Sequence, residues 1–249
     1  MISQAQIKFI RSLQQKKFRD QHGLFVAEGE KIVRELLASD IRVRLLCGQG
    51  SWIEKNLVPQ AGADIIEVSS RELGRISGLK TPNKVLAVAE QPILRLPENF
   101  TESEVVVMLD DIRDPGNLGT IVRTADWFGV RHIICSPSTA DIYNPKVVQA
   151  TMGSVFRVKV HYASLPATIQ QIGGMLSVYA TSAGGENIFK SRLKLPAALI
   201  IGNEARGISD EVASLAGQSL SVPGFTADRA ESLNAAVSAG IVMAFFRNA

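Results

Sequence analysis

The sequence predicts an α/β fold, with a mainly parallel sheet covered by helices in residues 104–249 and a smaller α/β domain in residues 1–98. Two observations predict it. Short apolar stretches alternate with helix-like stretches along the chain, which is typical of a parallel sheet with helices on its faces. Residues 92–104 contain two prolines and several polar residues that interrupt the apolar pattern, as a linker between domains does.

Hydrophobic periodicity predicts the elements of both parts. In the first part we expect helices over residues 7–17 and 30–38 and strands over 43–47, 65–68 and 85–89. In the second part the clearest helix covers residues 118–128, because its apolar residues recur at helical spacing and Gly129 follows as a helix C-terminal glycine would. The other expected elements are strands over 105–109, 133–135, 155–160, 176–180, 198–201 and 219–222, and helices over 145–152, 165–172, 210–216 and 230–246.

Composition excludes several classes of protein. Hydrophobic residues make up 46% and charged residues 20%, which suits a packed globular core. No apolar run approaches the roughly 20 residues that span a bilayer, and the charged start of the chain has no signal-peptide core. Cys47 and Cys135 lie far apart without a CxxC pattern, and the three histidines lack metal-ligand spacing. We therefore expect no metal site, no disulfide framework, no membrane partner and a reducing cytoplasm.

Positive charge is concentrated at the N-terminus. Residues 1–100 hold 15 Lys and Arg against 11 Asp and Glu, a net charge of +4, whereas the remainder holds 12 against 13, a net charge of −1. This asymmetry favours an anionic macromolecular partner for the first part, although an ordinary solvated helix face would look the same. The candidate contacts are the five basic residues of the first 19 positions, which contain no acid: Lys8, Arg11, Lys16, Lys17 and Arg19.

Three loops in the second part carry unusual residues where strands end, which is where α/β sheets bind ligands. They are the segments 110–119, 200–207 and 222–234. Each has an ordinary explanation on its own: a turn and helix start, a chain reversal, or a helix cap. Arg123, on the helix after the first loop, lies away from the apolar face of that helix. It is either a solvated arginine or a guanidinium directed at phosphate or ribose.

Taken together, the loops resemble the motifs of the SpoU/TrmH family of RNA ribose methyltransferases, in the SPOUT superfamily. The first loop matches DPxNxGxxxR, the second matches GxExxG, and the third matches the IP…SLN pattern. Two positions depart from the pattern: Val222 replaces Ile, and Gly224-Phe225 replaces a Met-Gly-like pair. The matching residues are Asp114, Pro115, Asn117, Gly119 and Arg123; Gly202, Glu204 and Gly207; and Val222, Pro223, Ser232, Leu233 and Asn234.

The resemblance implies a fold and an assembly. Residues 104–249 would form a SPOUT domain with a deep trefoil knot, an exception to the rule that chains do not thread loops. Residues 1–98 are similar to the family's RNA-binding domain, which is L30e-like. The family works as a homodimer with the active site near the subunit interface. It binds S-adenosylmethionine through backbone groups at positions that match Gly202, Val222 and Leu233.

The resemblance also implies a reaction, methyl transfer to a ribose 2′-hydroxyl of structured RNA, with ribosomal RNA favoured and transfer RNA possible. The candidate catalytic residues are Arg123, Asn117, Glu204, Ser232 and Asn234. Because a guanidinium stays protonated in proteins, we expect Arg123 to fix a phosphate and stabilise the developing alkoxide. A catalytically silent RNA-binding or assembly protein is the alternative from another class. A nucleotide-binding enzyme is disfavoured by the absence of GxGxxG and GxxxxGK[ST] motifs.

Overall fold

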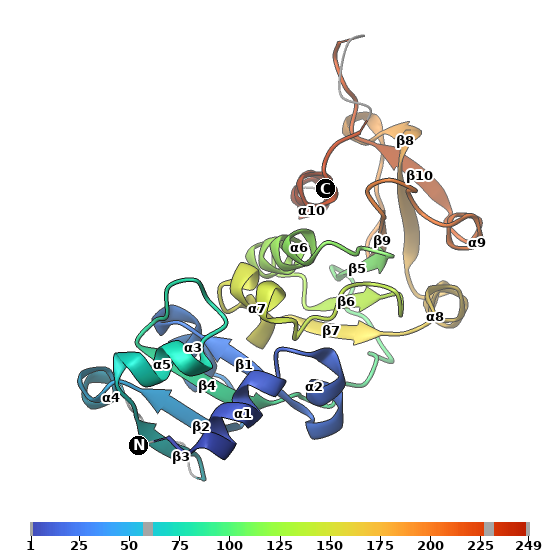
Figure 1. Ribbon diagram of the computed structural model, residues 1–249. Helices are drawn as coiled ribbons and strands as arrows, with labels where there is room; N and C mark the ends of the chain where they lie inside the picture. The colour runs from blue at the N-terminus through green and yellow to red at the C-terminus, as the bar shows by residue number, and fades with distance from the viewer. Residues whose placement is uncertain (1, 57–61, 227–231, 248–249) are drawn as a thin grey trace. The chain divides into compact units, whose positions relative to one another are not determined.

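The structure, a computed structural model, describes residues 2–56, 62–226 and 232–247 (Figure 1). The chain divides into two compact units. The first unit comprises Met1–Ile93 together with Asp141–Arg157, and the second comprises Leu94–Ala140 together with Val158–Ala249. Within the described ranges, none of the helices has the length and apolar character needed to span a bilayer.

The first unit is built on a four-stranded sheet of order β1-β4-β2-β3. Its central strand β4 runs antiparallel to both β1 and β2, and β3 runs parallel to β2. The strands are β1 (Leu24–Glu28), β2 (Val43–Gly48), β3 (Asp64–Glu67) and β4 (Val85–Glu90), and the helices are α1 (Gln4–Ser12), α2 (Lys16–His22), α3 (Glu30–Leu37), α4 (Gly50–Asn56) and α5 (Ser70–Ile76).

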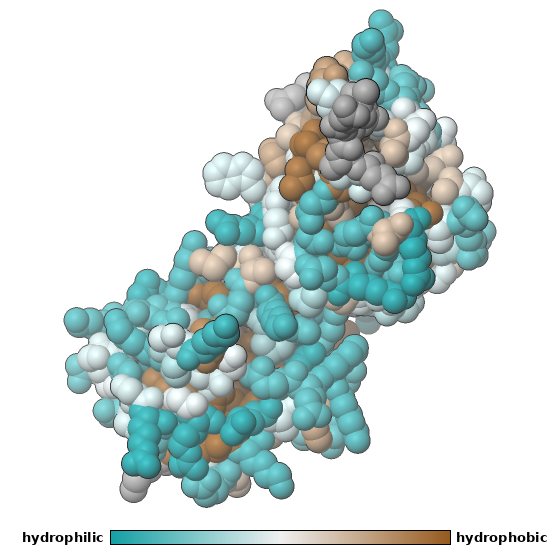
Figure 2. All heavy atoms as spheres, turned by 45° about the horizontal axis from the view of Figure 1, so that its top comes forward, coloured by the Kyte–Doolittle hydropathy of each residue, from teal (hydrophilic) through white to brown (hydrophobic). Residues whose placement is uncertain are grey.

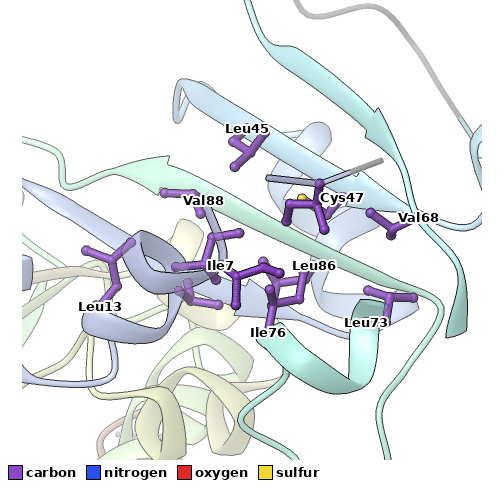
Figure 3. Packing of buried hydrophobic residues seen from close by; sticks show 12 residues of the cluster. Ile7, Leu13, Leu45, Cys47, Val68, Leu73, Ile76, Leu86 and Val88 are labelled. Atoms are coloured by element: carbon purple, nitrogen blue, oxygen red, sulfur yellow. The ribbon is translucent and has the colours of Figure 1, made fainter. Parts of the chain in front are cut away.

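Helices α1 and α5 cover one face of this sheet (Figure 3). Their inward side chains, among them Ile7, Leu73 and Ile76, pack with Leu86 and Val88 of β4 in one hydrophobic cluster. Each helix begins at a serine whose side chain accepts from the third helical backbone N–H, in a reciprocal capping box. The core of the first unit therefore fixes which faces of α1 and α5 point to solvent.

The predicted helix over residues 7–17 is wrong, because the chain forms two helices, α1 and α2, with a break between them. The Arg19 guanidinium donates hydrogen bonds of 2.9 Å to the carbonyl oxygens of both Leu13 and Gln14. These carbonyls are therefore satisfied by a side chain instead of by a continuing helical turn. Apolar periodicity does not predict this end of α1, because the end depends on hydrogen bonds from Arg19, a residue of the next helix.

A segment of the sequence-predicted second domain packs within the first unit. It contains α7 (Pro145–Thr151) and the 3-10 turn η1 (Ser154–Phe156). Asp141 pairs with the Nη2 atom of Arg19 at 2.5 Å, and the ring of Tyr143 stacks on Phe25 with centroids 4.7 Å apart. The predicted strand over 155–160 is accordingly displaced, since η1 occupies its start and β7 begins only at Lys159.

The second unit is built on a six-stranded sheet of order β10-β8-β9-β5-β6-β7, and every pair of neighbouring strands is parallel. This confirms the mainly parallel α/β architecture. Figure 1 shows α6 and α10 on one side of the sheet and α8 and α9 on the other. The elements are β5 (Val105–Asp110), α6 (Pro115–Trp127), β6 (His132–Cys135), β7 (Lys159–Tyr162), α8 (Leu165–Ile172), β8 (Ser177–Asn187), η2 (Ile188–Lys190), β9 (Ala197–Gly202), α9 (Asp210–Ala213), β10 (Gln218–Ser221) and α10 (Ala235–Arg247).

The last helix is anchored at its C-terminal end. The Arg247 guanidinium donates to the carbonyl oxygens of Phe128, Gly129 and Ser103 at 2.6, 2.8 and 3.2 Å. These bonds tie the end of α10 to the end of α6 and to the residues just before β5. Of the helix predicted over 230–246, the structure describes Ala235 onward as helical, and residues 230 and 231 lie outside the described residues.

Candidate functional site

The candidate site lies at the carboxyl ends of β5 and β9. These neighbouring parallel strands end side by side, with Asp110 opposite Gly202, so the loops that follow them are adjacent. The first loop leads directly into α6, where the Asp114 carboxylate accepts from the backbone N–H of Asn117 at 2.8 Å. Pro115 occupies the first turn, where its missing N–H costs nothing. The DPGN sequence thus serves both as a helix start and as the support for Asn117.

The Asn117 side chain connects the three sequence motifs. Its Nδ2 donates to Glu204 Oε1 at 2.5 Å, and its Oδ1 accepts from Asn234 Nδ2 at 2.9 Å. Asn234 in turn caps α10, because its Oδ1 accepts from the backbone N–H groups of Ala236 and Val237. Three predicted site residues, separated by up to 117 positions in sequence, therefore meet through two hydrogen bonds.

Asn203, which sequence reasoning missed, shapes the second loop. Its side chain donates to the carbonyl oxygen of Asp111 at 2.8 Å and accepts from the backbone N–H groups of Ala205 and Arg206. Its backbone N–H and C=O also pair with Gly207 at 2.9 Å each way. The loop that carries Glu204 is thereby closed on itself and fastened to the first loop. An asparagine beside the motif glycine was the available signal, since its side chain commonly bonds nearby backbone.

Gly202 must be a glycine for a steric reason. A Cβ atom built on it would lie 2.3 Å from the carbonyl carbon of Gly207, far inside van der Waals contact. Gly207 has φ of 71°, in the left-handed region that favours glycine. The two glycines of the GxExxG pattern thus allow a turn so tight that its two ends touch.

Two acidic residues lie at the end of β5, Asp110 as its last residue and Asp111 just after it. Asp110 is buried, and its carboxylate accepts from the backbone N–H and the hydroxyl of Ser209 at 2.9 and 2.8 Å. Burial raises the pKa of Asp111, but hydrogen bonds from Arg113 and Ser138 and the charges of Arg113 and Arg206 outweigh it, so the pKa is lowered. Asp111 is therefore held as a carboxylate beside the loop that carries Glu204.

The remaining predicted site residues are solvent-accessible. Arg123 is exposed on α6, as its place on the helical wheel predicts, and it forms no hydrogen bond or ion pair within residues 2–56, 62–226 and 232–247. Ser232 is exposed and Leu233 is 47% exposed in the turn before α10, and Val222 is half-buried after β10. Residues 227–231, between these positions, lie outside the described residues.

The five basic residues predicted to contact RNA fall into two groups. Lys8, Arg11, Lys16 and Lys17 are exposed on α1 and α2, and Lys16 pairs with Asp20 at 2.8 Å. Arg19 is instead only 2% exposed, and its guanidinium is already bonded to the carbonyl oxygens of Leu13 and Gln14 and to the Asp141 carboxylate. The expectation that Arg19 contacts RNA is therefore corrected: its guanidinium fastens the segment after Asp141 to the first unit.

Comparison with known proteins identifies the family. Residues 104–244 match the SpoU rRNA methylase family, and residues 4–87 match the MRM3-like substrate binding domain. The chain is 30% identical over 244 residues to the 23S rRNA (guanosine(2553)-2′-O)-methyltransferase RlmP of Bacillus subtilis, covering 97% of this chain and 95% of that protein.

Solved structures agree in fold and in family. A TrmH-family protein from Porphyromonas gingivalis superposes with a TM-score of 0.90 at 37% identity, covering 100% of this chain and 99% of that chain. The AdoMet-bound rRNA methyltransferase from Sinorhizobium meliloti superposes with a TM-score of 0.87 at 34% identity, covering 100% and 97%. The resemblance drawn from the three loops is confirmed, and this chain belongs to the SpoU rRNA methylase family.

Proposed function

We propose that this protein transfers a methyl group from S-adenosylmethionine to a ribose 2′-hydroxyl of ribosomal RNA. The observation that carries the proposal is the Asn117 side chain, which joins the three family motifs through its bonds to Glu204 and Asn234. The Bacillus subtilis relative, which is named as a 23S rRNA 2′-O-methyltransferase, supports the reaction and favours ribosomal RNA.

The loops suit S-adenosylmethionine. Gly202 presents its backbone without a side chain at the tip of β9, and Val222 and Leu233 offer partly exposed apolar surface to an adenine ring. These are the three positions that the family resemblance assigns to the cofactor. When bound, S-adenosylmethionine supplies an electrophilic methyl group on a sulfonium.

The chain's own residues then have two tasks. They must align the ribose hydroxyl with the methyl group, which is worth up to roughly 7–11 kcal/mol in well-oriented systems, and they must stabilise the alkoxide as it develops. We assign the second task to Arg123, whose exposed guanidinium also binds a substrate phosphate in a bidentate manner. Asn117 and Asn234 join the first loop to the second and third loops through their hydrogen bonds. Glu204 would face the positive charge of the bound cofactor, and Ser232 would contact the ribose.

Substitution of Arg123 tests this assignment. Arg123→Ala should lower the single-turnover rate of methyl transfer about 100- to 1000-fold, as the loss of a preorganised transition-state donor does. Arg123→Lys should recover only a small part of the rate, because an ammonium cannot make the planar two-point contact. A Lys variant with a near-normal rate across the pH range would rule out the requirement for a guanidinium.

We also propose that the protein works as a homodimer through the outer face of α6 and α10. These helices pack together, and Trp127 on α6 is 85% exposed while Val237 on α10 is 51% exposed. Figure 2 shows hydrophobic residues at the surface of the second unit among hydrophilic ones. Arg123 lies one helical turn before Trp127 on the same face, which would bring it to the interface.

Sedimentation of a Trp127→Glu variant tests the dimer. Wild type should sediment as a dimer at micromolar concentration and the variant as a monomer, because a charge would replace the most exposed aromatic ring of this face. Phe225→Glu, which changes a 92% exposed residue outside α6 and α10, is the matched control and should remain dimeric. A wild-type protein that is monomeric at every concentration would contradict the proposal.

Three further properties complete the proposal. The second domain carries a trefoil knot in which the last helix is threaded through a loop, an expectation that family membership supports. The exposed Lys8, Arg11, Lys16 and Lys17 bind RNA phosphates, so affinity should fall steeply with salt. The protein works in the cytoplasm, where its two buried free cysteines stay reduced.

The reaction itself is tested with labelled S-adenosylmethionine and RNA from a strain that lacks the gene. The full chain should transfer label to ribosomal RNA, and mapping should find a single 2′-O-methylated nucleotide. If label appeared only in transfer RNA, the substrate would be transfer RNA and not ribosomal RNA. No transfer to either RNA, with binding retained, would favour a catalytically silent RNA-binding protein.

A further inference from the structure

We propose that the RNA-binding surface of the first unit is shared by α1, α5 and the segment after α5, and that Arg71, Arg75 and Lys80 bind phosphates beside Lys8 and Arg11. We call these five residues the basic surface. The inference rests on the proposed function, because it takes the partner to be structured RNA. It goes beyond the sequence-based prediction, which placed all the contacts on α1 and α2.

Helices α1 and α5 form one platform. Their inward side chains share a hydrophobic cluster on the same face of the sheet, as Figure 3 shows for Ile7 and Ile76. Their outer parts are joined by a hydrogen bond of 2.8 Å from Arg75 Nη2 to Gln4 Oε1. A second bond, of 3.3 Å, runs from the Ile2 backbone N–H to Glu72 Oε1. Charges on the two helices are therefore held in a fixed relation.

The solvent-facing side of this platform is positively charged. Arg71 and Arg75 lie one turn apart on α5, Lys8 and Arg11 lie three residues apart on α1, and all four are exposed. Helix α1 contains no acidic residue. The acid of α5, Glu72, is already engaged by the backbone N–H and hydroxyl of Ser69 and by Ile2. Within the part of the chain that the structure describes, no carboxylate pairs with any of these four cations.

Other arginines of the same unit differ in this respect. Arg34 pairs with Glu30 at 3.1 Å, and Arg44 pairs with Glu90 at 2.5 Å. Their positive charges are already paired with carboxylates of the protein, so a bound phosphate would stabilise them less. The contrast indicates that the basic surface is left for an external partner, and it supplies matched controls for mutagenesis.

The segment after α5 extends the platform. Its start is fixed by the buried Glu28, whose carboxylate accepts from the Ser77 hydroxyl and from the Gly78 backbone N–H. A Cβ atom on Gly78 would lie 2.9 Å from the Gln14 side chain, so this segment also touches the turn after α1. The exposed Lys80 follows two residues later. Five cations thus project from a rigid base, and three of them are guanidinium forks suited to phosphodiester oxygens.

The full-length double variant Arg71→Gln/Arg75→Gln tests the proposal with ribosomal RNA as the probe. The RNA concentration that gives half the maximal methylation rate should rise at least about 10-fold, while the saturating rate and the affinity for S-adenosylmethionine stay unchanged. The slope of log affinity against log salt should become shallower by about 1.4–1.8, since each of the two lost phosphate contacts removes about 0.7–0.9. Arg42→Gln/Arg44→Gln removes two arginines that both pair with Glu90 and makes the same change in charge. It should shift RNA affinity less than about twofold.

Several outcomes separate this inference from the proposed function. If Arg71→Gln/Arg75→Gln kept the wild-type RNA affinity, salt slope and methylation, the proposed role of the basic surface would be contradicted. The proposed methyltransferase function would not be affected. Absence of methylation by the wild type would overturn the proposed function instead. If the arginine variant fails to fold, Lys8→Gln/Lys80→Gln must show the same loss of affinity and of salt slope, because neither lysine has a partner within the described residues. Unchanged binding in that variant would also overturn the inference.

Discussion

The two units use their polar residues in different ways. In the second unit, side chains from distant parts of the chain are bonded to one another at the strand ends, as Asn117 is to Glu204 and Asn234. In the first unit, the cations of the basic surface lie on α1, on α5 and in the segment after α5. Within the described residues, only Arg75 among them donates a side-chain hydrogen bond, to Gln4. The difference matches the tasks that we propose for the two units: chemistry on a ribose hydroxyl requires alignment within a fraction of an ångström, whereas holding a polyanion requires positive charge at suitable spacing.

The largest expected effect concerns the stability of the first unit. Arg19→Gln should lower the free energy of unfolding by about 3 kcal/mol, because it leaves the Asp141 carboxylate without its buried partner. Chemical denaturation of the full chain measures this loss. Lys16→Gln, which breaks the exposed pair with Asp20, is the control and should change stability by less than about 0.5 kcal/mol. Equal effects of the two substitutions would mean that Arg19 is not structural.

The next largest effect is on the rate of methyl transfer, and it comes from a substitution at the candidate site of the second unit. Asn117→Ala removes both bonds that join the motifs and should lower the single-turnover rate about 100-fold, while RNA affinity stays within twofold of wild type. The Arg71→Gln/Arg75→Gln variant should show the opposite pattern. Quench-flow methylation and RNA titration on both proteins provide the comparison. If Asn117→Ala lost as much RNA affinity as methylation rate, the proposal that the two units serve separate functions would be contradicted.

The smallest effect is a pH dependence in the second unit. His132 Nδ1 and His161 Nε2 lie 3.1 Å apart, and burial lowers the pKa of both rings, that of His161 from 6.5 to about 4. Because the folded pKa is below the unfolded one, the stabilisation is present above pH 6.5 and is lost as the pH falls towards 4. Between these limits the free energy of unfolding should fall by about 1–3 kcal/mol.

Substitution separates this histidine effect from general acid unfolding. Denaturation curves at pH 7 and pH 4.5 should show a smaller pH-dependent loss in His161→Gln than in wild type. His22→Gln, at an exposed position on α2, should keep the full loss. An identical pH dependence in all three proteins would exclude the histidine pair as its origin.

The fold was largely predictable because it depends on patterns that act locally. Alternation of apolar strands and helices predicted the parallel sheet, and helix 165–172 was predicted with its observed bounds. Strand β1 and helices α4 and α5 were missed. Of these, α5 begins with the capping box of Ser69 and Glu72, a signal that apolar periodicity does not weigh.

The structure brings three of the predicted site residues together, but the hydrogen bonds that join them were not predictable from the sequence. Motif order identified Asn117, Glu204 and Asn234, yet only the fold shows that one asparagine bonds to both of the others. Arg19 was misassigned because charge alone does not distinguish a phosphate ligand from a buried ion-pair partner, and its partner Asp141 lies 122 positions away. Asn203 was missed because its role consists of bonds to backbone groups, which no side-chain motif records.

The central claim is that the chain methylates a ribose hydroxyl, and an RNA substrate altered at one atom tests it most directly. Once the methylated nucleotide has been mapped, a synthetic fragment is prepared with a 2′-deoxy sugar at that position and compared with the unmodified fragment in single-turnover reactions. We predict full transfer to the unmodified RNA and none to the deoxy substrate, with equal binding of both. Undiminished transfer to the deoxy substrate would place the methyl group on a base and contradict the account.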